Sequence, residues 1–257
     1  MITARDGWPP KAAMILGAGM GTRMRPLSDD RPKPLIELAG RALIDHVLER
    51  LCAVGVEDVI VNIHYKADML EQHLQARAQA LPGLSISDER DCLLDTGGGV
   101  ARALEQYEPV IGKAPFWIHN SDSVWIEQTD NPALDQMANA WNGSRMDCLL
   151  MLASRDNAIG YDGKGDFELD VSGRLIRRQR DQTAPYVFAG VSIMRPELFK
   201  NTPQGPFSLN LLWNKAMEAE RAFGICANMT WMHVGDPAAL ALAEKQMSQN
   251  PHRAVRL

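Results

Sequence analysis

The sequence contains little of what marks disulfide-bonded, zinc-binding or nucleic-acid-binding proteins. Its four cysteines, Cys52, Cys92, Cys148 and Cys226, are far apart and form no C-x-x-C pair. A zinc site or a disulfide framework is therefore not indicated, and reduced thiols are expected. Basic residues are not in excess either, because the net charge is −5. This balance argues against a broad nucleic-acid-binding surface.

Long hydrophobic runs are also missing. The apolar stretch at residues 12–18 is short, contains Gly17 and continues into Gly19, Gly21 and two arginines. Such a stretch is too short to span a bilayer and is a poor signal peptide. We therefore expect a cytoplasmic protein without a membrane segment, in which this stretch forms a first buried strand. No feature of the sequence points to an obligate protein partner.

Apolar residues make up 46% of the 257 residues, which is enough for a sizeable core. Apolar runs alternate with amphipathic stretches, and we expect strands at residues 12–16, 58–63, 84–87, 115–119 and 148–153 and helices at 42–54, 67–79, 98–107 and 132–141. Alternation of this kind predicts parallel strands joined by right-handed crossovers, and a sheet covered on both faces.

The pattern changes after residue 155. A hairpin is expected at residues 167–170 and 174–176, a strand at 187–194, and helices at 209–220 and 237–247. There is no internal repeat, low-complexity tract or linker. We therefore predict one α/β domain over residues 1–257, Rossmann-like with a mostly parallel mixed sheet, whose halves divide near residue 145.

A glycine-rich turn follows the first strand. Gly17, Gly19 and Gly21 alternate with other residues, and Arg23 and Lys33 come next. Glycines let backbone N–H groups approach a ligand, and a turn at the carboxyl end of a first strand is where open α/β sheets bind phosphate. Arginine adds a forked pair of donors, and lysine adds a compact charge. The alternative is a tight turn followed by a solvated basic loop.

Two other phosphate-binding motifs fit this turn poorly. A dinucleotide-binding turn has a third glycine where this sequence has Thr22, and a P-loop ends in Gly-Lys-Ser/Thr, which is missing here. Residues 16–35, LGAGMGTRMRPLSDDRPKPL, instead resemble the signature of sugar-1-phosphate nucleotidyltransferases. The signature combines a Gly-x-Gly-Thr-Arg turn with a later Pro-Lys-Pro.

The resemblance covers most of the chain. Residues 61–65, VNIHY, are similar to the end of the family's second strand. Residues 94–99, LDTGGG, resemble the L-x-T-G-G-G loop of its bacterial N-acetylmuramate 1-phosphate uridylyltransferase branch. Residues 166–167, 188–191 and 233–235 match later blocks of that branch more weakly.

This resemblance implies a three-layer nucleotidyltransferase fold and a reaction. A sugar 1-phosphate oxygen would attack the α-phosphorus of a nucleoside triphosphate and release pyrophosphate. The substrates implied are UTP and N-acetylmuramate 1-phosphate, in peptidoglycan recycling in the cytoplasm. A mannose- or glucose-1-phosphate nucleotidyltransferase and a non-catalytic nucleotide-sugar sensor remain as alternatives.

The resemblance also implies roles for individual residues. Catalysis would fall to Arg23, Lys33 and Asp122. The nucleotide would lie against Leu16, Gly17, Ala18, Gly19, Gly21, Thr96, Gly97 and Gly98. The half after residue 145 would hold the sugar phosphate, through Asn157, Lys164 and Gly190. The alternatives are a helix-capping Thr96, a turn-forming Asp122 and a solvated loop around Lys164.

A Mg²⁺ ion is implied as cofactor, with Asp122 as its first ligand. The family's second ligand is an aspartate, but His233 stands at that position. Imidazole is a poor Mg²⁺ ligand and suits Mn²⁺ better. His233 could bind the metal, hold a metal-bound water, or be replaced by Asp236, which also fits a helix N-cap. We favour Asp122 with substrate phosphates as ligands and His233 just outside them.

Overall fold

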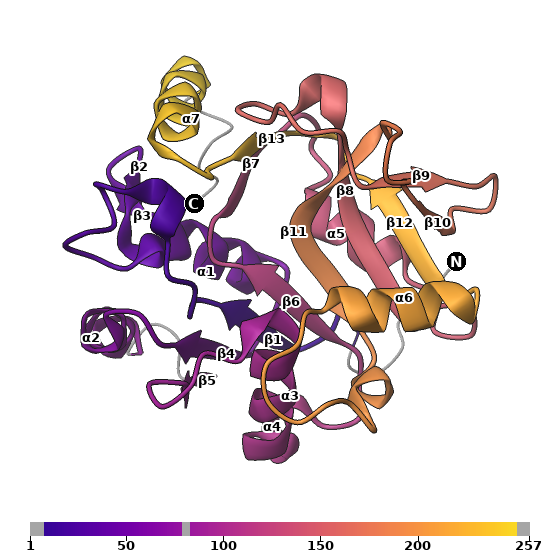
Figure 1. Cartoon of the computed structure of the whole chain (residues 1–257), viewed down its shortest axis with the longest axis horizontal. Helices are drawn as coiled ribbons and strands as arrows, with labels where there is room; N and C mark the ends of the chain where they lie inside the picture. The colour runs from indigo at the N-terminus through magenta and orange to yellow at the C-terminus, as the bar shows by residue number, and fades with distance from the viewer. Residues whose placement is uncertain (1–7, 79–82, 251–257) are drawn as a thin grey trace.

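The computed structural model describes residues 8–78 and 83–250, and a nine-stranded mixed sheet forms its centre (Figure 1). Across the sheet run β5 (Gly83–Asp88), β4 (Asp58–Ile63), β1 (Ala12–Leu16), β6 (Phe116–Asn120), β11 (Tyr186–Met194), β8 (Cys148–Ser154) and β12 (Ala222–Cys226). The hairpin of β9 (Phe167–Leu169) and β10 (Leu175–Arg177) adjoins the start of β11. The first four strands are parallel, and β11 is antiparallel to β6 and β8.

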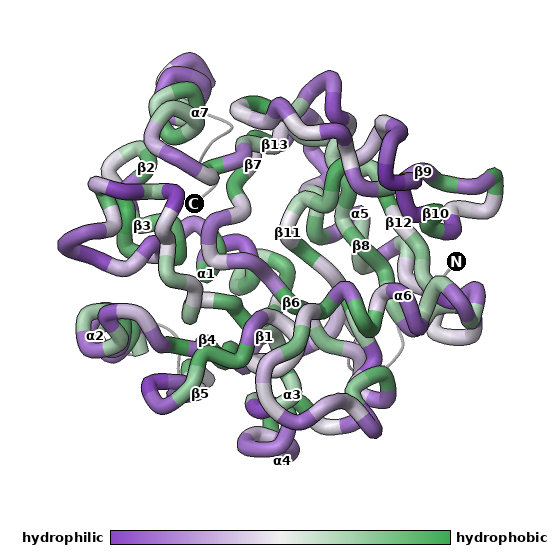
Figure 2. Tube along the Cα trace, viewed as in Figure 1, coloured by the Kyte–Doolittle hydropathy of each residue, from purple (hydrophilic) through white to green (hydrophobic). Residues whose placement is uncertain are grey.

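Helices cover both faces of this sheet. Successive side chains of a strand point to opposite faces, so Ala13 and Ile15 join one apolar cluster while Ala12 and Met14 join another. The first cluster includes α1 (Leu43–Ala53), α2 (Ala67–Arg77) and α5 (Ala133–Ala140). The second includes α3 (Asp95–Gln106), α4 (Glu108–Ile111) and α6 (Asn210–Glu218). The predicted three-layer α/β fold is confirmed, and Figure 2 shows the apolar residues concentrated in central strands such as β4 and β8.

A third apolar cluster joins the two ends of the chain. Strands β7 (Ser123–Glu127) and β13 (Met229–His233) pair antiparallel, and β2 (Glu37–Leu38) pairs with β3 (Arg41–Ala42). Buried side chains of β2, β7 and β13 pack with those of α7 (Pro237–Gln249). Glu244 Oε1 accepts a hydrogen bond from the Ala39 N–H at 2.9 Å. The C-terminal helix therefore lies against the N-terminal hairpin (Figure 1).

Short 3₁₀ helices complete the structure at Thr22–Met24 (η1), Lys33–Leu35 (η2), Arg155–Asn157 (η3) and Pro196–Phe199 (η4). Within the described residues, no helix has the length and apolar character needed to cross a membrane.

Most predicted elements lie within a few residues of their observed bounds. The helix expected at 67–79 ends at Arg77, and its expected last residue, Gln79, lies outside the described residues. The helix expected at 98–107 begins earlier, at Asp95, and includes Thr96. The alternative of a helix-capping Thr96 is therefore wrong, since Leu94 holds the cap position, without a side-chain hydrogen bond. Strands β7, β12 and β13 were not predicted, because each depends on a partner distant in the sequence.

Candidate active site

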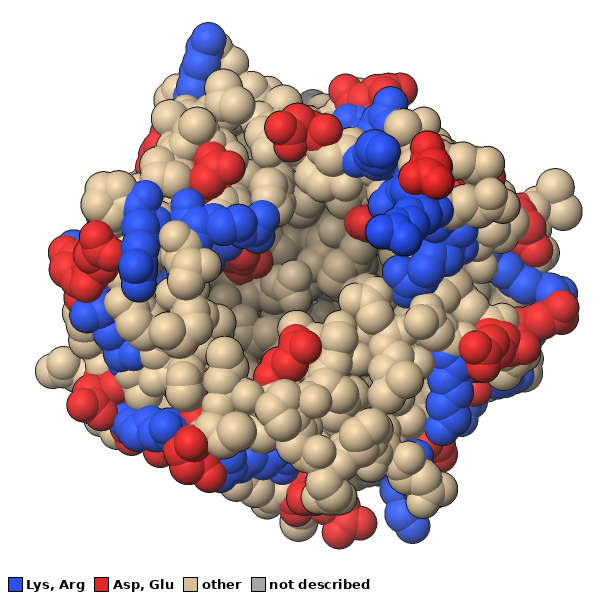
Figure 3. Space-filling model, in the orientation of Figure 1, with Lys and Arg blue, Asp and Glu red and all other residues tan. Residues whose placement is uncertain are grey.

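A cavity of about 360 Å³ opens at the carboxyl ends of β1, β4 and β6, and Figure 3 shows a hollow in the middle of this face. The carboxyl edge of parallel strands is where open α/β sheets bind ligands. Several residues predicted from the sequence line the cavity: Leu16, Gly17, Ala18, Gly19, Lys33, Thr96 and Asp122. The tertiary structure thus brings the glycine-rich turn and Asp122, about a hundred positions apart, to one place.

Other lining residues were not singled out as site residues. These are Pro34, Asn62, Leu93, Asp95, Asn120 and Ser121. Asn62 and Asn120 lie near the carboxyl ends of β4 and β6, next to β1 in the sheet. A search for polar residues at the carboxyl end of a buried strand would have identified Asn120, the last residue of β6, whereas Asn62 lies inside β4.

Lys33 and Asp122 form an ion pair inside the cavity. Lys33 Nζ donates to Asp122 Oδ2, and their side chains are only 13% and 30% exposed. Burial alone would raise the pKa of Asp122, but the charge and hydrogen bond of Lys33 outweigh it and hold that pKa below its usual value. Asp122 is therefore an anion at neutral pH, as a carboxylate that binds a cation must be.

His233 lies in the same electrostatic environment. Burial lowers its pKa, Arg23 and Lys33 act in the same direction, and the negative charge of Asp122 opposes them. The ring packs edge-on against Tyr161, with 5.9 Å between ring centroids. A neutral imidazole near a carboxylate is the expected result.

This geometry leaves few protein ligands for a metal. Within the part of the chain that the structure describes, no group of three or more acidic, histidine or cysteine side chains could enclose a metal. Asp122 and His233 are close enough to interact electrostatically, so the protein offers at most a carboxylate and an imidazole. This set fits a cation whose other ligands are phosphate oxygens. Asp236 instead caps α7, where its Oδ1 accepts from the Ala239 N–H at 2.9 Å.

Arg23 and Gly21 lie at the edge of the site. Gly21 precedes η1 with a φ of 62°, and Arg23 is exposed within η1. Neither belongs to the residues that line the cavity. The charge of Arg23 nevertheless lies within electrostatic reach of His233, whose pKa it helps to lower.

The glycines of the second predicted loop face a protein segment. The N–H groups of Gly97 and Gly98 both donate to the Phe207 carbonyl oxygen, at 2.8 and 3.0 Å. The Thr96 hydroxyl accepts from the Leu209 N–H at 3.0 Å. Thr96 lines the cavity, whereas Gly97 and Gly98 do not. The two glycines hold the segment before α6, and their contact with nucleotide stays a prediction.

The predicted sugar-phosphate residues lie outside this cavity. Asn157 and Lys164 are exposed in the segment after β8, and Gly190, with a φ of 84°, lies where the register of β11 shifts. A Cβ at Gly190 would come within 2.7 Å of the Ser123 Cβ, which gives this glycine a packing role.

The segment after β8 nevertheless adjoins the predicted metal site. The Ile159 N–H donates to the Trp231 carbonyl oxygen at 2.9 Å, and the His233 N–H donates to the Ile159 carbonyl oxygen at 2.8 Å. The region expected to hold the sugar phosphate therefore borders His233.

Fold and cavity together define a class of protein: an α/β protein whose glycine-rich turn and Lys33–Asp122 pair line a cavity at the carboxyl edge of its sheet. The family of nucleotidyl transferases matches residues 12–163. The chain belongs to this nucleotidyl transferase family.

Relatives agree with this assignment. The N-acetylmuramate alpha-1-phosphate uridylyltransferase of Caulobacter vibrioides is 47% identical over 93% of this chain and 98% of its own length. The protein of that name in Neisseria meningitidis is 31% identical over 90% and 96%. The mannose-1-phosphate guanylyltransferase catalytic subunit beta of Dictyostelium discoideum is 28% identical over 88% of this chain and 61% of its own length.

Solved structures show the same fold. A UDP-glucose pyrophosphorylase complexed with UDP-glucose superposes with a TM-score of 0.72 at 15% identity, over 93% of this chain and 98% of that one. The HddC protein of Yersinia pseudotuberculosis, complexed with GMP-PN, also has a TM-score of 0.72, at 19% identity over 92% and 99%.

Proposed function

We propose that this enzyme transfers UMP from UTP to N-acetylmuramate α-1-phosphate, releases pyrophosphate, and acts in the cytoplasm in peptidoglycan recycling. The observation that carries the proposal is the Lys33–Asp122 pair in a cavity formed by the glycine-rich turn. The 47% identity to a uridylyltransferase of this specificity, over almost the full length of both chains, supports the choice of substrates.

The reaction needs positioning and charge neutralisation more than a protein nucleophile. An oxygen of the sugar phosphate attacks the α-phosphorus and forms a new P–O bond, while the bond to the β-phosphate breaks and its electrons leave with pyrophosphate. Lys33 would bind the phosphate where charge develops, and Arg23 would neutralise the leaving pyrophosphate from the edge of the site. Asn157, Lys164 and Gly190 belong to the region proposed to receive the sugar phosphate.

We propose Mg²⁺ as the cofactor, replaceable by Mn²⁺, held by Asp122 and substrate phosphates. When bound, the cation neutralises phosphate charge so that a second anion can approach. Asp122 contributes the carboxylate, and His233, with a neutral ring, lies just outside the ligands of the cation. The proposal accounts for the departure at His233, because phosphate oxygens supply the ligands that a second aspartate would have supplied.

The experiment is a panel of sugar 1-phosphates tested against UTP, GTP, CTP and ATP, with pyrophosphate release as readout. We expect the highest kcat/KM for UTP with N-acetylmuramate α-1-phosphate. A higher kcat/KM for GTP with mannose 1-phosphate would instead favour a guanylyltransferase, as in the relative from Dictyostelium discoideum. Nucleotide binding without pyrophosphate release under any condition would favour the sensor.

A further inference from the structure

A buried chain of hydrogen bonds connects the two ends of the nucleotide cavity. The Gly17 N–H donates to Asn62 Oδ1 at 2.7 Å, and Asn62 Nδ2 donates to Glu89 Oε1 at 2.7 Å. The other carboxylate oxygen, Glu89 Oε2, accepts from the Leu94 N–H at 3.1 Å. The chain thus runs from the glycine-rich turn through β4 to the residue before α3.

The two side chains of this pair are buried at an energetic cost. Asn62 is 2% exposed and Glu89 is 0% exposed. A carboxylate removed from water is costly unless well compensated, and burial raises the pKa of Glu89 despite its two hydrogen bonds. The nearby Arg102 forms its ion pair with Asp91, at 2.9 Å, and not with Glu89. Apolar side chains would avoid the cost of burying a carboxylate but would leave the Gly17 and Leu94 N–H groups without acceptors. The pair therefore joins these two backbone segments as well as filling the space between them.

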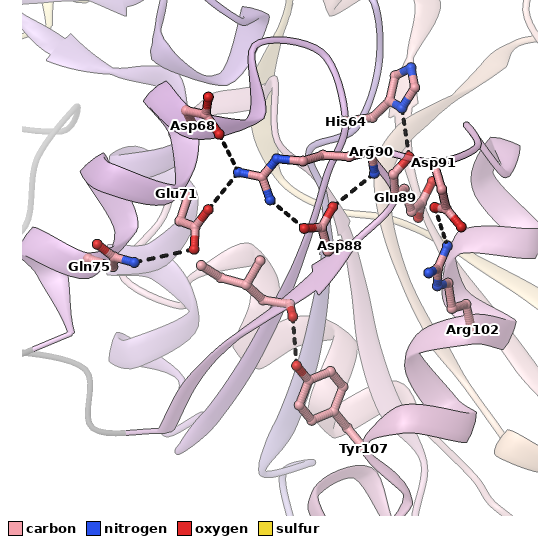
Figure 4. Close-up of polar contacts among 11 residues, drawn as sticks. His64, Asp68, Glu71, Gln75, Asp88, Glu89, Arg90, Asp91, Arg102 and Tyr107 are labelled. Atoms are coloured by element: carbon pink, nitrogen blue, oxygen red, sulfur yellow. Dashed lines mark hydrogen bonds and ion pairs between the residues drawn. The ribbon is translucent and has the colours of Figure 1, made fainter.

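Contacts of the neighbouring residues fix the backbone around Glu89 (Figure 4). His64 Nδ1 donates to the Glu89 carbonyl oxygen at 2.7 Å. Arg90 binds Asp68 and Glu71, each at 2.6 Å, and also Asp88. The backbone on both sides of Glu89 is therefore tied down.

Gly99 completes the fit. A Cβ at this position would lie 2.6 Å from Glu89 Oε1 and 2.7 Å from Asn62 Nδ2. Both atoms belong to buried side chains that are hydrogen-bonded to each other, so moving either one away would break that bond. The third glycine of residues 97–99 therefore makes space for the pair, not for a ligand.

The order of strands shows which part of the nucleotide each end receives. Along the sheet edge, β6 is followed by β1, β4 and β5. Lys33 and Asp122 lie at the β6 end, where phosphate and cation meet. The other end is formed by Leu93, Asp95 and Thr96, and no Lys or Arg is among its lining residues. Triphosphate belongs at the cationic end, so the base and ribose belong at the end that Glu89 holds.

We propose that Asn62 and Glu89 are a positioning pair for the nucleoside, which sets the distance between the glycine-rich turn and the segment that receives the base. Their hydrogen-bonding groups face Gly17, Leu94 and each other, so they act through the backbone and not on the reacting atoms. The inference rests on the cavity binding a nucleoside triphosphate, as proposed above. It assigns the pair to nucleotide affinity and not to the sugar phosphate.

The test exchanges the two chemical groups. In Glu89→Gln one of the two accepting oxygens becomes an NH₂ donor. That NH₂ group then faces either the Asn62 NH₂ or the Leu94 N–H, which are also donors, so one hydrogen bond is lost. In Asn62→Asp two carboxylates face each other. In the double variant, Asn62→Asp with Glu89→Gln, all three hydrogen bonds can re-form, because the amide at position 89 donates to the carboxylate at position 62 and still accepts from Leu94.

The measurements are KM for each substrate by pyrophosphate release, nucleotide Kd by calorimetry without sugar phosphate, and Tm. The nucleoside triphosphate is the one with the highest kcat/KM in wild type. Loss of a buried hydrogen bond predicts that each single variant raises nucleotide KM and Kd about tenfold or more. The KM for sugar phosphate should stay within about twofold, and the double variant should regain most of the nucleotide affinity.

The matched control is Ser87→Ala, which removes the hydrogen bond from Ser87 Oγ to Gln106 Oε1 at 3.1 Å, also at a buried position on β5. It should lower Tm without changing nucleotide KM. Single variants that lower Tm as the control does but keep wild-type nucleotide Kd would overturn the proposal, as would a double variant no better than the singles. Failure of wild type to bind any nucleotide would overturn the proposed function as well.

Discussion

Lys33 and Asp122 form an ion pair whose two charges are proposed to bind different ligands, phosphate and a cation. Each neutralises the other at a site that is mostly out of water, where an unpaired charge would be costly. We expect the pair to separate when phosphate and cation enter, since phosphate then compensates Lys33 and the cation compensates Asp122.

Replacing either basic residue should slow the chemical step. We expect Arg23→Ala and Lys33→Ala each to lower kcat about 100- to 1000-fold while the fold stays intact, because each removes a charge that stabilises the transition state. Lys11→Ala is the control, since Lys11 pairs with Glu57 at 2.9 Å near the opposite end of β1. The measurement is pyrophosphate release at saturating substrates, with circular dichroism to verify folding. Near-wild-type rates for both site variants would refute their assignment.

Removing the metal or its carboxylate should abolish turnover. We expect no activity in EDTA and none for Asp122→Asn, because Arg23 and Lys33 cannot alone neutralise the phosphates of both substrates. His233→Ala should be only partly impaired, because His233 lies outside the proposed ligands. Mn²⁺ should be unusually effective relative to Mg²⁺ in wild type, because Mn²⁺ tolerates a neighbouring imidazole nitrogen better than Mg²⁺ does. The three proteins are compared in EDTA, Mg²⁺ and Mn²⁺. A His233→Ala enzyme as inactive as Asp122→Asn would show that His233 is itself a ligand.

At the scale of elements, the segment carrying Arg23 and Lys33 packs on an apolar cluster. Met24 and Ile36 are buried in the cluster formed with β7, β13 and α7. Elements from the end of the chain therefore support the loop that bears the first half of the site.

Loosening this support should affect both stability and rate. Met24 is 0% exposed, and Met24→Ala should destabilise the protein by about 2–5 kcal/mol through the cavity it leaves. It should also lower kcat, because η1 would no longer hold Arg23 in place. Leu242→Ala, at a side chain 49% exposed on α7, should change stability by no more than about 0.5 kcal/mol. Urea unfolding and turnover of both variants check this, and an undiminished kcat in Met24→Ala would contradict the supporting role.

At the scale of the whole molecule, one buried histidine should contribute to loss of stability in acid. His119 is 0% exposed on β6, and burial lowers its pKa to about 4. Its ring stacks on Trp125 with 5.7 Å between centroids, and Nδ1 donates to the Asn120 carbonyl oxygen at 2.8 Å. The folded state therefore holds this ring neutral, whereas the unfolded chain protonates it near pH 6.5.

Because the pKa of His119 is lower in the folded state than in the unfolded chain, its contribution to the free energy of unfolding is complete above pH 6.5 and is lost as pH falls towards 4. By pH 5 the loss is about 2 kcal/mol. We expect His119→Phe to be less stable than wild type at pH 7.5 but to lose about 2 kcal/mol less between pH 7.5 and pH 5, measured by urea unfolding. The other histidines are common to both proteins, so equal losses would show that His119 does not titrate in this way.

The sequence by itself determined the features that depend on neighbouring residues. Strands such as residues 58–63 and the turn at Gly17–Gly21 were predictable because apolar periodicity and turn chemistry are local. The family resemblance suggested Lys33 and Asp122 as site residues, and both line the cavity at the carboxyl edge of the sheet. The three-layer arrangement followed from the alternation of strands and helices.

Only the tertiary structure decided what depends on distant partners. The pairing of β7 with β13 and the packing of α7 on the first hairpin join segments about a hundred or more positions apart. Asn62 and Glu89 appear in the sequence as a strand residue and a loop acid, and only folding shows that they share one hydrogen-bonded chain. The glycines at 97–99 suggest a ligand loop in the sequence, and only the structure shows that Cβ atoms at these positions would meet Phe207, Gly205 and Glu89. Close packing between separate segments determines these roles, and no local pattern records it.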